Sequence, residues 1–208
     1  YRRYSRMFKD AVRAITPQVE DRGIDEIYID LTEAVIGSAA DGAPDPWARA
    51  RAVALDIQRA VREATGLSCS VGITQNKLLS KIASELNKPG GISVVRPDDL
   101  RSVIWPLAVR KINGIGPKAN AKLERLGVRT IGELARQDPA WLIGHFGRSF
   151  GAWMHEAAHG RDERPVVTRS EPKSVSRETT FENDLHAVHD KARLSKIFTD
   201  LCVRVAGD

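Results

Sequence analysis

The sequence of 208 residues predicts an α+β fold, in which a partial ferredoxin-like half is followed by an all-helical half. Up to about residue 96, segments of helical spacing alternate with short runs rich in β-branched residues. Their order is helix, two strands, helix, strand, helix, strand. From Pro97 onward, recurring glycines separate short helical segments. One more strand in front would complete a β-α-β-β-α-β plan with an additional helix.

Turn and capping residues set the expected elements of the first half. The first helix should end near Thr16, and a hairpin with its turn at Gly23 should join strands at 18–21 and 27–31. Asp45 should cap a helix that ends before Gly66. The other expected elements are a loop over 37–46, a strand over 67–74, a helix over 75–86 and a strand over 92–95.

The second half is expected to be helical to about residue 165. Thr130 and Glu133 fit a capping box at the start of one of its helices. Residues 174–181 have a strand pattern and 185–205 an amphipathic helical one. Because one strand and one helix cannot bury a core alone, a further domain should be cut short here. Residue 1 is Tyr in a helical pattern, so we expect a fragment of a longer protein.

Composition narrows the class of protein. With 42% hydrophobic residues the chain can bury a core, and it has no run of about 18 apolar residues that would span a membrane. Cys69 and Cys202 lie far apart, so no disulfide framework or zinc ribbon is expected. The net charge of +5 is compatible with a nucleic-acid partner but common elsewhere. We expect a cytoplasmic monomer that does not bind membranes.

Asp25 and Glu26 are the first candidates for chemistry. A hairpin turn breaks the alternation of a strand, so both carboxylates can point to one place, where a hard divalent cation would relieve their repulsion. An acidic surface turn has the same two-residue pattern. The wider run over 24–31 resembles the S-I/L-D-E-A-Y/F-L-D block of Y-family DNA polymerases, with Gly23 and Ile27 as departures. The resemblance implies that Asp25 and Glu26 are catalytic metal ligands.

A second block begins a helix after a strand. Lys77 and Lys81 are four residues apart, which places them on one face where cations could hold a triphosphate, although a solvated helix face has the same spacing. The runs 71–84 and 87–91 resemble the family's V-G-I/V-x-x-N/V-K-x-L/F-A-K-I/L-A-S and N-K-P-x-G blocks. By that resemblance, Lys81 contacts the phosphates of the incoming nucleotide.

A third block over 112–123 has two glycines around one apolar residue, followed by a proline that opens a helix. Free N–H groups at such a helix start can bind a DNA phosphate without reading sequence. A plain pair of antiparallel helices is the alternative. The pattern is that of a helix-hairpin-helix motif, and its candidate DNA-binding residues are Gly114, Ile115, Gly116, Lys118 and Lys122.

Three blocks in the family order make the chain similar to the DinB, or DNA polymerase IV, branch of the Y-family. The resemblance implies a palm over 1–88, a thumb over 89–165, a linker over 166–173 and the start of a little finger over 174–208. It also implies templated translesion synthesis by two-metal nucleotidyl transfer from a deoxynucleoside triphosphate, with two Mg²⁺ ions in the complete enzyme. Primer-template DNA is the expected partner, and a sliding clamp is another for the full-length protein.

The family's first metal-binding Asp would lie on a strand outside the chain, as would the fingers. We therefore expect the 208 residues alone to bind DNA but not to extend a primer with Mg²⁺. A catalytically silent, DNA-binding homologue is one alternative. Another is a zinc metalloprotease, because His155, Glu156 and His159 fit H-E-x-x-H. The run over 160–166 instead resembles the G-x-D-x-R-P-V end of the polymerase thumb.

Overall fold

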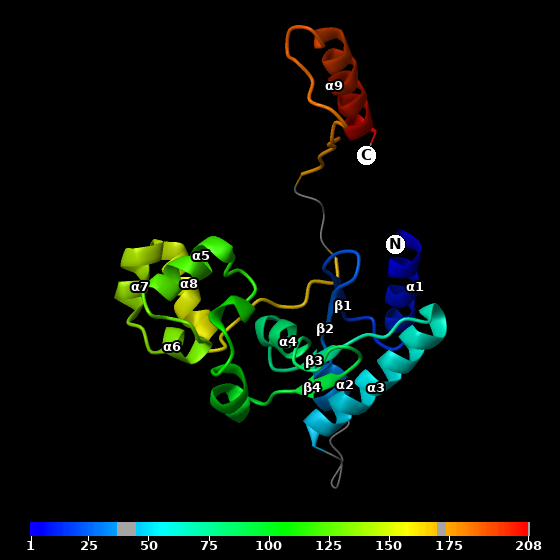
Figure 1. The fold of residues 1–208 in the computed structure, drawn as a ribbon. Helices are drawn as coiled ribbons and strands as arrows, with labels where there is room; N and C mark the ends of the chain where they lie inside the picture. Colours follow the sequence, from blue (N-terminus) through cyan, green and yellow to red (C-terminus); the bar gives the residue numbers. More distant parts are fainter. Residues whose placement is uncertain (37–44, 170–173, 208) are drawn as a thin grey trace. The chain divides into compact units, whose positions relative to one another are not determined.

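The computed structural model describes residues 1–36, 45–169 and 174–207 and has the mixed helix and strand content that the sequence predicts (Figure 1). The chain forms two compact units, residues 1–168 and 169–208. Among the helices of the described residues, none is long and apolar enough to cross a membrane. Parts of the expected loop over 37–46 and of the expected linker over 166–173 lie outside the described residues.

The first part of unit 1 contains every strand of the described chain. Its elements, in chain order, are α1 (Arg2–Arg13), β1 (Val19–Asp21), β2 (Ile27–Ile29), α2 (Thr32–Ile36), α3 (Pro46–Thr65), β3 (Val71–Ile73), α4 (Lys77–Ala83) and β4 (Ile92–Val94). The order agrees with the prediction except for the short helix α2. β3 and α4 are shorter than expected.

Helix α3 is the long support of this part, and its ends confirm the capping prediction. The carboxylate of Asp45 accepts a hydrogen bond from the Trp47 N–H, and Gly66 ends the helix in the left-handed conformation at φ 73°. One face of α3 is buried through Ala54, Ile57 and Val61. This face packs against α1 (Figure 1). Val12 of α1 belongs to the same apolar cluster.

The strands form two separate two-stranded sheets. β1 pairs antiparallel with β2, with Val19 opposite Ile29, whereas β3 pairs parallel with β4, with Val71 opposite Ile92. The ferredoxin-like plan requires one sheet, and no strand of the described residues joins β2 to β3. A ferredoxin-like arrangement therefore remains a proposal.

The second part of unit 1 is helical, as predicted. It contains a 3-10 turn (Pro97–Asp99), a π-helical turn (Leu100–Ile104), a second 3-10 turn (Val109–Lys111) and the helices α5 (Pro117–Arg125), α6 (Ile131–Ala135), α7 (Pro139–Phe146) and α8 (Arg148–Ala158). The predicted capping box is present at α6, where the Thr130 hydroxyl accepts from the Glu133 N–H at 3.1 Å.

One apolar core joins α4 to the helical part. Leu78, Leu79 and Ile82 of α4 are buried in the same cluster as Leu123 of α5 and Leu142 of α7. α7 and α8 pack closely, because Gly151 brings the α8 backbone against the backbone of Leu142. The position of α4 is therefore fixed by the helical part as well as by β3.

Unit 2 differs from its prediction. Residues 174–181 form no strand, because the described residues of unit 2 contain no other strand to pair with them. The helix α9 (Lys191–Ala206) begins six residues later than residue 185, since residues 187–190 form a turn. None of its residues is buried, and Phe198 is 70% exposed.

Candidate functional site

A pocket of unit 1, about 1020 Å³ in volume, brings the first two predicted motifs together. Residues of the β1–β2 hairpin, of α1, α2, α3, β3 and α4, and of the segment over 162–166 line it. Asp25 and Glu26 line it beside Lys81, 55 positions further along the chain. The fold thus places two acidic groups and a cation in one concave space.

The hairpin turn presents the two acidic residues. Gly23 supplies a backbone conformation of φ 130°, and the N–H of Arg22 donates to the Glu26 carbonyl at 3.1 Å to close the turn. Asp25 is exposed at this turn, and Glu26 is half-buried. The carboxylate of Glu26 forms an ion pair with the ammonium of Lys81.

Lys81 projects from the last turn of α4, and Asn76 is the N-cap of this helix. The Asn76 side chain accepts a hydrogen bond from the Leu79 N–H at 3.0 Å, which caps the helix. The Lys81 side chain is 25% exposed, and that of Glu26 is 40% exposed, so both groups can reach solvent. The pair therefore stays accessible to a ligand that enters the pocket.

Lys77 does not share this environment, although it is only four residues away. Its ammonium donates to the Glu20 carboxylate and to the Pro165 carbonyl, each at 2.7 Å. The side chains of Lys77 and Glu20 are only 10% and 9% exposed. The shared helix face therefore does not give the two lysines the same surroundings: Lys77 is a buried structural cation, and Lys81, the residue predicted to contact the triphosphate, is the more exposed of the two.

Several contacts hold the segment over 160–167 against α4 and β1. Asn76 Nδ2 donates to the Gly160 carbonyl at 2.7 Å, and the N–H of Leu78 donates to Asp162 Oδ2 at 3.0 Å. The N–H of Val167 donates to Glu20 Oε2 at 2.8 Å. Glu20 and Lys77 therefore fix the chain where it leaves the helical part, a role that the sequence motifs did not indicate.

The Glu20 carboxylate makes the stability of unit 1 sensitive to acid. Burial alone raises its pKa, but the hydrogen bonds from Lys77 and Val167 lower it more, so the pKa lies below the ordinary 4.5. This stabilisation is present above pH 4.5 and is lost as the pH falls through the lowered value. We expect the free energy of unfolding to fall with decreasing pH below 4.5, and less steeply in Glu20→Gln. Urea unfolding at several pH values measures both slopes, and equal slopes would contradict this account.

The third motif forms a tight turn before α5. Gly114 has φ 116°, and a Cβ there would lie 2.5 Å from the Trp153 ring, so only glycine fits. Gly116 is the N-cap of α5 with ordinary backbone angles and open space around it. Ile115 is buried, so its side chain packs in the core, which leaves its backbone for the predicted DNA-binding role. The backbone N–H groups of the first turn of α5 belong to the residues that come after Gly116.

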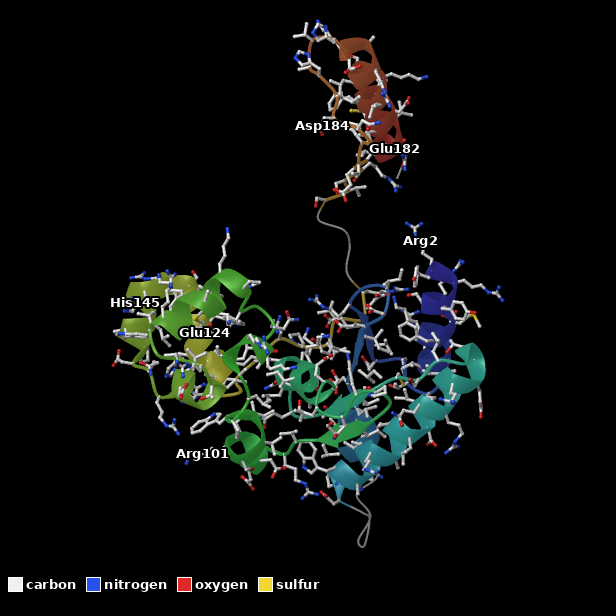
Figure 2. All side chains as sticks on the ribbon, in the orientation of Figure 1. Arg2, Arg101, Glu124, His145, Glu182 and Asp184 are labelled. Atoms are coloured by element: carbon white, nitrogen blue, oxygen red, sulfur yellow. The ribbon has the colours of Figure 1, made fainter. Side chains whose placement is uncertain are left out.

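The two lysines of this motif differ. Lys118, in the first turn of α5, is exposed. The Lys122 ammonium instead donates to the carbonyl of His145, which is labelled in Figure 2, and lies 4.9 Å from the centre of the Phe146 ring. Lys122 thus ties α5 to the end of α7, and Lys118 is the exposed cation beside the helix start.

Two further pocket residues lie in the motif runs but were not predicted as site residues. Tyr28 of β2 lines the pocket, and burial raises the pKa of its phenol. Its ring centre lies 5.6 Å from the Lys77 ammonium. Arg164 donates to Asp162 at 2.7 Å and also lines the pocket. The signal in the sequence was the family resemblance of the run over 24–31 for Tyr28 and of the run over 160–166 for Arg164.

The H-E-x-x-H residues lie at the end of α8. Arg161 forms an ion pair with Glu156, which lowers the pKa of that carboxyl to about 2 together with the neighbouring His155. Nδ1 of His159 lies 2.8 Å from the His155 carbonyl. Among the described residues, no group of three or more histidine, cysteine and acidic side chains is arranged to hold a metal. The low pKa makes the Glu156 carboxylate a weak base, whereas the metalloprotease motif uses this residue as a general base. The arrangement therefore does not favour the metalloprotease alternative.

Comparison with known proteins places these motifs in context. Residues 1–85 match the impB/mucB/samB family, and residues 97–128 match the IMS family HHH motif. A DNA polymerase IV from Methanoculleus marisnigri is 43% identical over 80% of this chain and 43% of its own length. DNA polymerase IV proteins from Streptomyces coelicolor and Ralstonia nicotianae are 36% and 38% identical over 98% and 100% of this chain, and 41% and 57% of their own lengths.

The chain thus spans about half the length of the curated relatives that it matches. The matched segments contain the hairpin carboxylates, the α4 lysines and the glycine turn before α5. The relatives named above share the name DNA polymerase IV. These family matches and relatives show that the chain belongs to the impB/mucB/samB family, which is the Y-family.

Proposed function

We propose that the chain is part of a translesion DNA polymerase of the DNA polymerase IV type, which transfers a nucleotide from a deoxynucleoside triphosphate to a primer 3′-hydroxyl. The observation that carries this proposal is the ion pair between Glu26 and Lys81 beside Asp25 in one pocket. Residues from two distant motifs meet there with the charges that a metal and a triphosphate need. A cytoplasmic location and a monomeric state belong to the same proposal.

The donor set at the hairpin fits magnesium. Carboxylate oxygens are the ligands that Mg²⁺ prefers, and it is commonly held by one or two carboxylates together with substrate phosphates. Asp25 and Glu26 would hold it, since one is exposed and the other half-buried at the pocket wall. When bound, the two ions of the complete enzyme stabilise charge on the attacking and leaving oxygens.

The protein's own groups then have distinct roles. Lys81 would leave Glu26 and bind a phosphate oxygen, because its ammonium is a mobile point charge on a flexible stem. Glu20 and Lys77 would hold α4 and the segment over 160–167 in place. In domain terms we propose a palm over 1–88, a thumb over 89–165, a linker over 166–173 and the start of a little finger over 174–208.

Duplex binding would come from the start of α5. Three features meet there: an open N-cap at Gly116, a proline that begins the helix, and the exposed ammonium of Lys118. Backbone N–H groups at a helix start bind phosphate and position the duplex without reading sequence. Primer-template DNA is the proposed partner, and a sliding clamp is proposed for the full-length protein.

Gly116→Glu is expected to weaken duplex binding about tenfold at low salt, because a carboxylate would face the phosphate. The substitution should leave the fold intact, since a side chain at Gly116 meets open space. Fluorescence anisotropy with a labelled primer-template duplex measures the change.

Gly144→Glu is the matched control. It adds the same charge at another glycine with open space, on α7 instead of at the α5 start. It should change duplex affinity by less than about twofold. Equal weakening by both variants would indicate an effect of net charge and would reject the α5 start as the phosphate site.

A further inference from the structure

We propose that Lys9 of α1 is a positioning residue for the metal site, because its buried ammonium fixes the hairpin turn that presents Asp25 and Glu26. The inference rests on the proposed function, in which these two carboxylates hold Mg²⁺. Lys9 lies outside the motifs of the sequence and was not predicted as a site residue. Its hydrogen bonds go to Asp21 and Gly23, so it acts on the carboxylates through the backbone of the turn.

The tip of the hairpin has few backbone contacts of its own. At its base, the N–H of Arg22 donates to the Glu26 carbonyl at 3.1 Å. The three residues over 23–25 make no backbone–backbone hydrogen bond with any described residue. Gly23 also lacks a side chain that could bond its own turn, and its φ of 130° differs from that of a regular strand. Side chains from outside the tip are therefore needed to fix its course.

Two side chains bind both polar groups of the Gly23 backbone. The Gly23 N–H donates to Asp21 Oδ1 at 3.0 Å. The Lys9 ammonium donates to the Gly23 carbonyl and also, at 2.8 Å, to Asp21 Oδ1. Lys9, Asp21 and the Gly23 backbone thus form a closed ring of hydrogen bonds, and this ring lies two residues before Asp25 in the chain.

The cation of this ring is buried and comes from a helix that the core holds in place. The Lys9 side chain is 9% exposed, whereas that of Asp21 is 50% exposed. Val12, three positions further along α1, packs in one apolar cluster with Ile57 of α3. Hydrogen bonds to a charged donor are strong, and burial reduces the competition from water. The core therefore sets the position of the turn through the Lys9 ammonium.

A fixed turn matters most for Asp25. Glu26 is held by its ion pair with Lys81, but the exposed Asp25 carboxylate has no hydrogen bond or ion pair with any described residue. Ligands that are already in place bind a metal more tightly than ligands that binding must order. Loss of a group that orients a ligand commonly weakens metal affinity by about 10–100-fold. The ring formed by Lys9 and Asp21 is such a support for the backbone that carries Asp25.

The test is a titration of the 208-residue protein with Mg²⁺ alone, followed by the NMR chemical shifts of the Asp25 and Glu26 amides. We expect Lys9→Met to raise the dissociation constant at least about tenfold. In the metal-free protein the same variant should increase the backbone mobility of residues 23–25, measured by NMR relaxation, and leave β1 and β2 rigid. Lys9→Arg keeps a cation with donors for both oxygens and should restore most of the affinity.

Val12→Ala separates the positioning of the turn from the stability of the fold. Val12 lies in the same helix as Lys9 and is 1% exposed, so its truncation should destabilise unit 1 without removing a hydrogen bond of the turn. We expect its Mg²⁺ affinity to stay within about twofold of that of the wild type, because no group that orients a ligand is lost. Equal weakening by Lys9→Met and Val12→Ala would assign the effect to a loosened core and overturn the proposal.

Asp25→Asn distinguishes this inference from the proposed function on which it rests. In the wild type, Mg²⁺ should shift the amides of the turn, and Asp25→Asn should remove most of this response, because a carboxylate ligand is lost. A wild-type turn that does not respond to Mg²⁺ would contradict the proposed function and, with it, the role of Lys9. Binding that depends on Asp25 but is equally tight in the wild type and in Lys9→Met would overturn the role of Lys9 alone.

Discussion

Lys77→Met is expected to lower the free energy of unfolding of unit 1 by about 3–5 kcal/mol, the effect of removing one partner of a buried ion pair. The substitution leaves the Glu20 carboxylate buried without its nearest cation, with only the half-exposed Arg22 still 3.7 Å away. It also removes the hydrogen bond that the Pro165 carbonyl accepts at 2.7 Å. Urea unfolding followed by circular dichroism measures the loss.

Two comparisons test that reason. Lys88→Met removes the same charge from a lysine that is 52% exposed and pairs with Glu85, so it should change stability by less than about 1 kcal/mol. A double variant, Lys77→Met with Glu20→Leu, removes both buried charges and should recover most of the stability. If the double variant is less stable than Lys77→Met, desolvation of Glu20 is not the cause.

Lys81→Met is expected to weaken binding of a magnesium deoxynucleoside triphosphate by about 2 kcal/mol, or roughly thirtyfold, because one charge-assisted contact to phosphate is lost. Stability should change little, since the side chains of Lys81 and its partner Glu26 are 25% and 40% exposed and both reach solvent. Isothermal titration of the 208-residue protein with Mg²⁺ and deoxyadenosine triphosphate measures the affinity.

Lys88→Met again serves as the control, since Lys88 also lines the pocket. It removes the same charge at a position without a proposed phosphate contact and should alter triphosphate affinity by less than about threefold. Duplex affinity should be the same in both variants. Equal weakening of triphosphate binding by Lys81→Met and Lys88→Met would mean that only the net charge of the pocket matters.

Local signals in the sequence predicted the elements that depend on nearby residues. Asp45 and Gly66 fixed the ends of α3, and Thr130 with Glu133 fixed the start of α6. The hairpin formed where Gly23 allowed a turn, which placed Asp25 and Glu26 as expected. Each of these features depends on hydrogen bonds or backbone angles within a few positions.

Features that depend on distant partners were not predictable in this way. Helical spacing placed Lys77 and Lys81 on one face, but only the folded chain brings Glu20 and Pro165 to Lys77. Residues 174–181 have the composition of a strand, but they form none, because a strand needs another strand to pair with it. Sheet order likewise depends on strands that lie far apart in sequence, so the separation of β2 from β3 had no local signal.

The ion pair of Glu26 with Lys81 gives the most direct test of the proposed site. In the free protein Glu26 holds the ammonium that we assign to the triphosphate, and with Mg²⁺ it is assigned to the metal. Glu26→Gln should therefore have opposite effects on the affinity for deoxyadenosine triphosphate under the two conditions.

Titration of wild-type and Glu26→Gln protein, once with a chelator and once with Mg²⁺, measures both effects. We predict that Glu26→Gln strengthens binding without metal, because Lys81 is released, and weakens binding with Mg²⁺, because a metal ligand is lost. A variant that binds the triphosphate as the wild type does in both conditions, or more weakly in both, would contradict the assignment of Glu26 and Lys81.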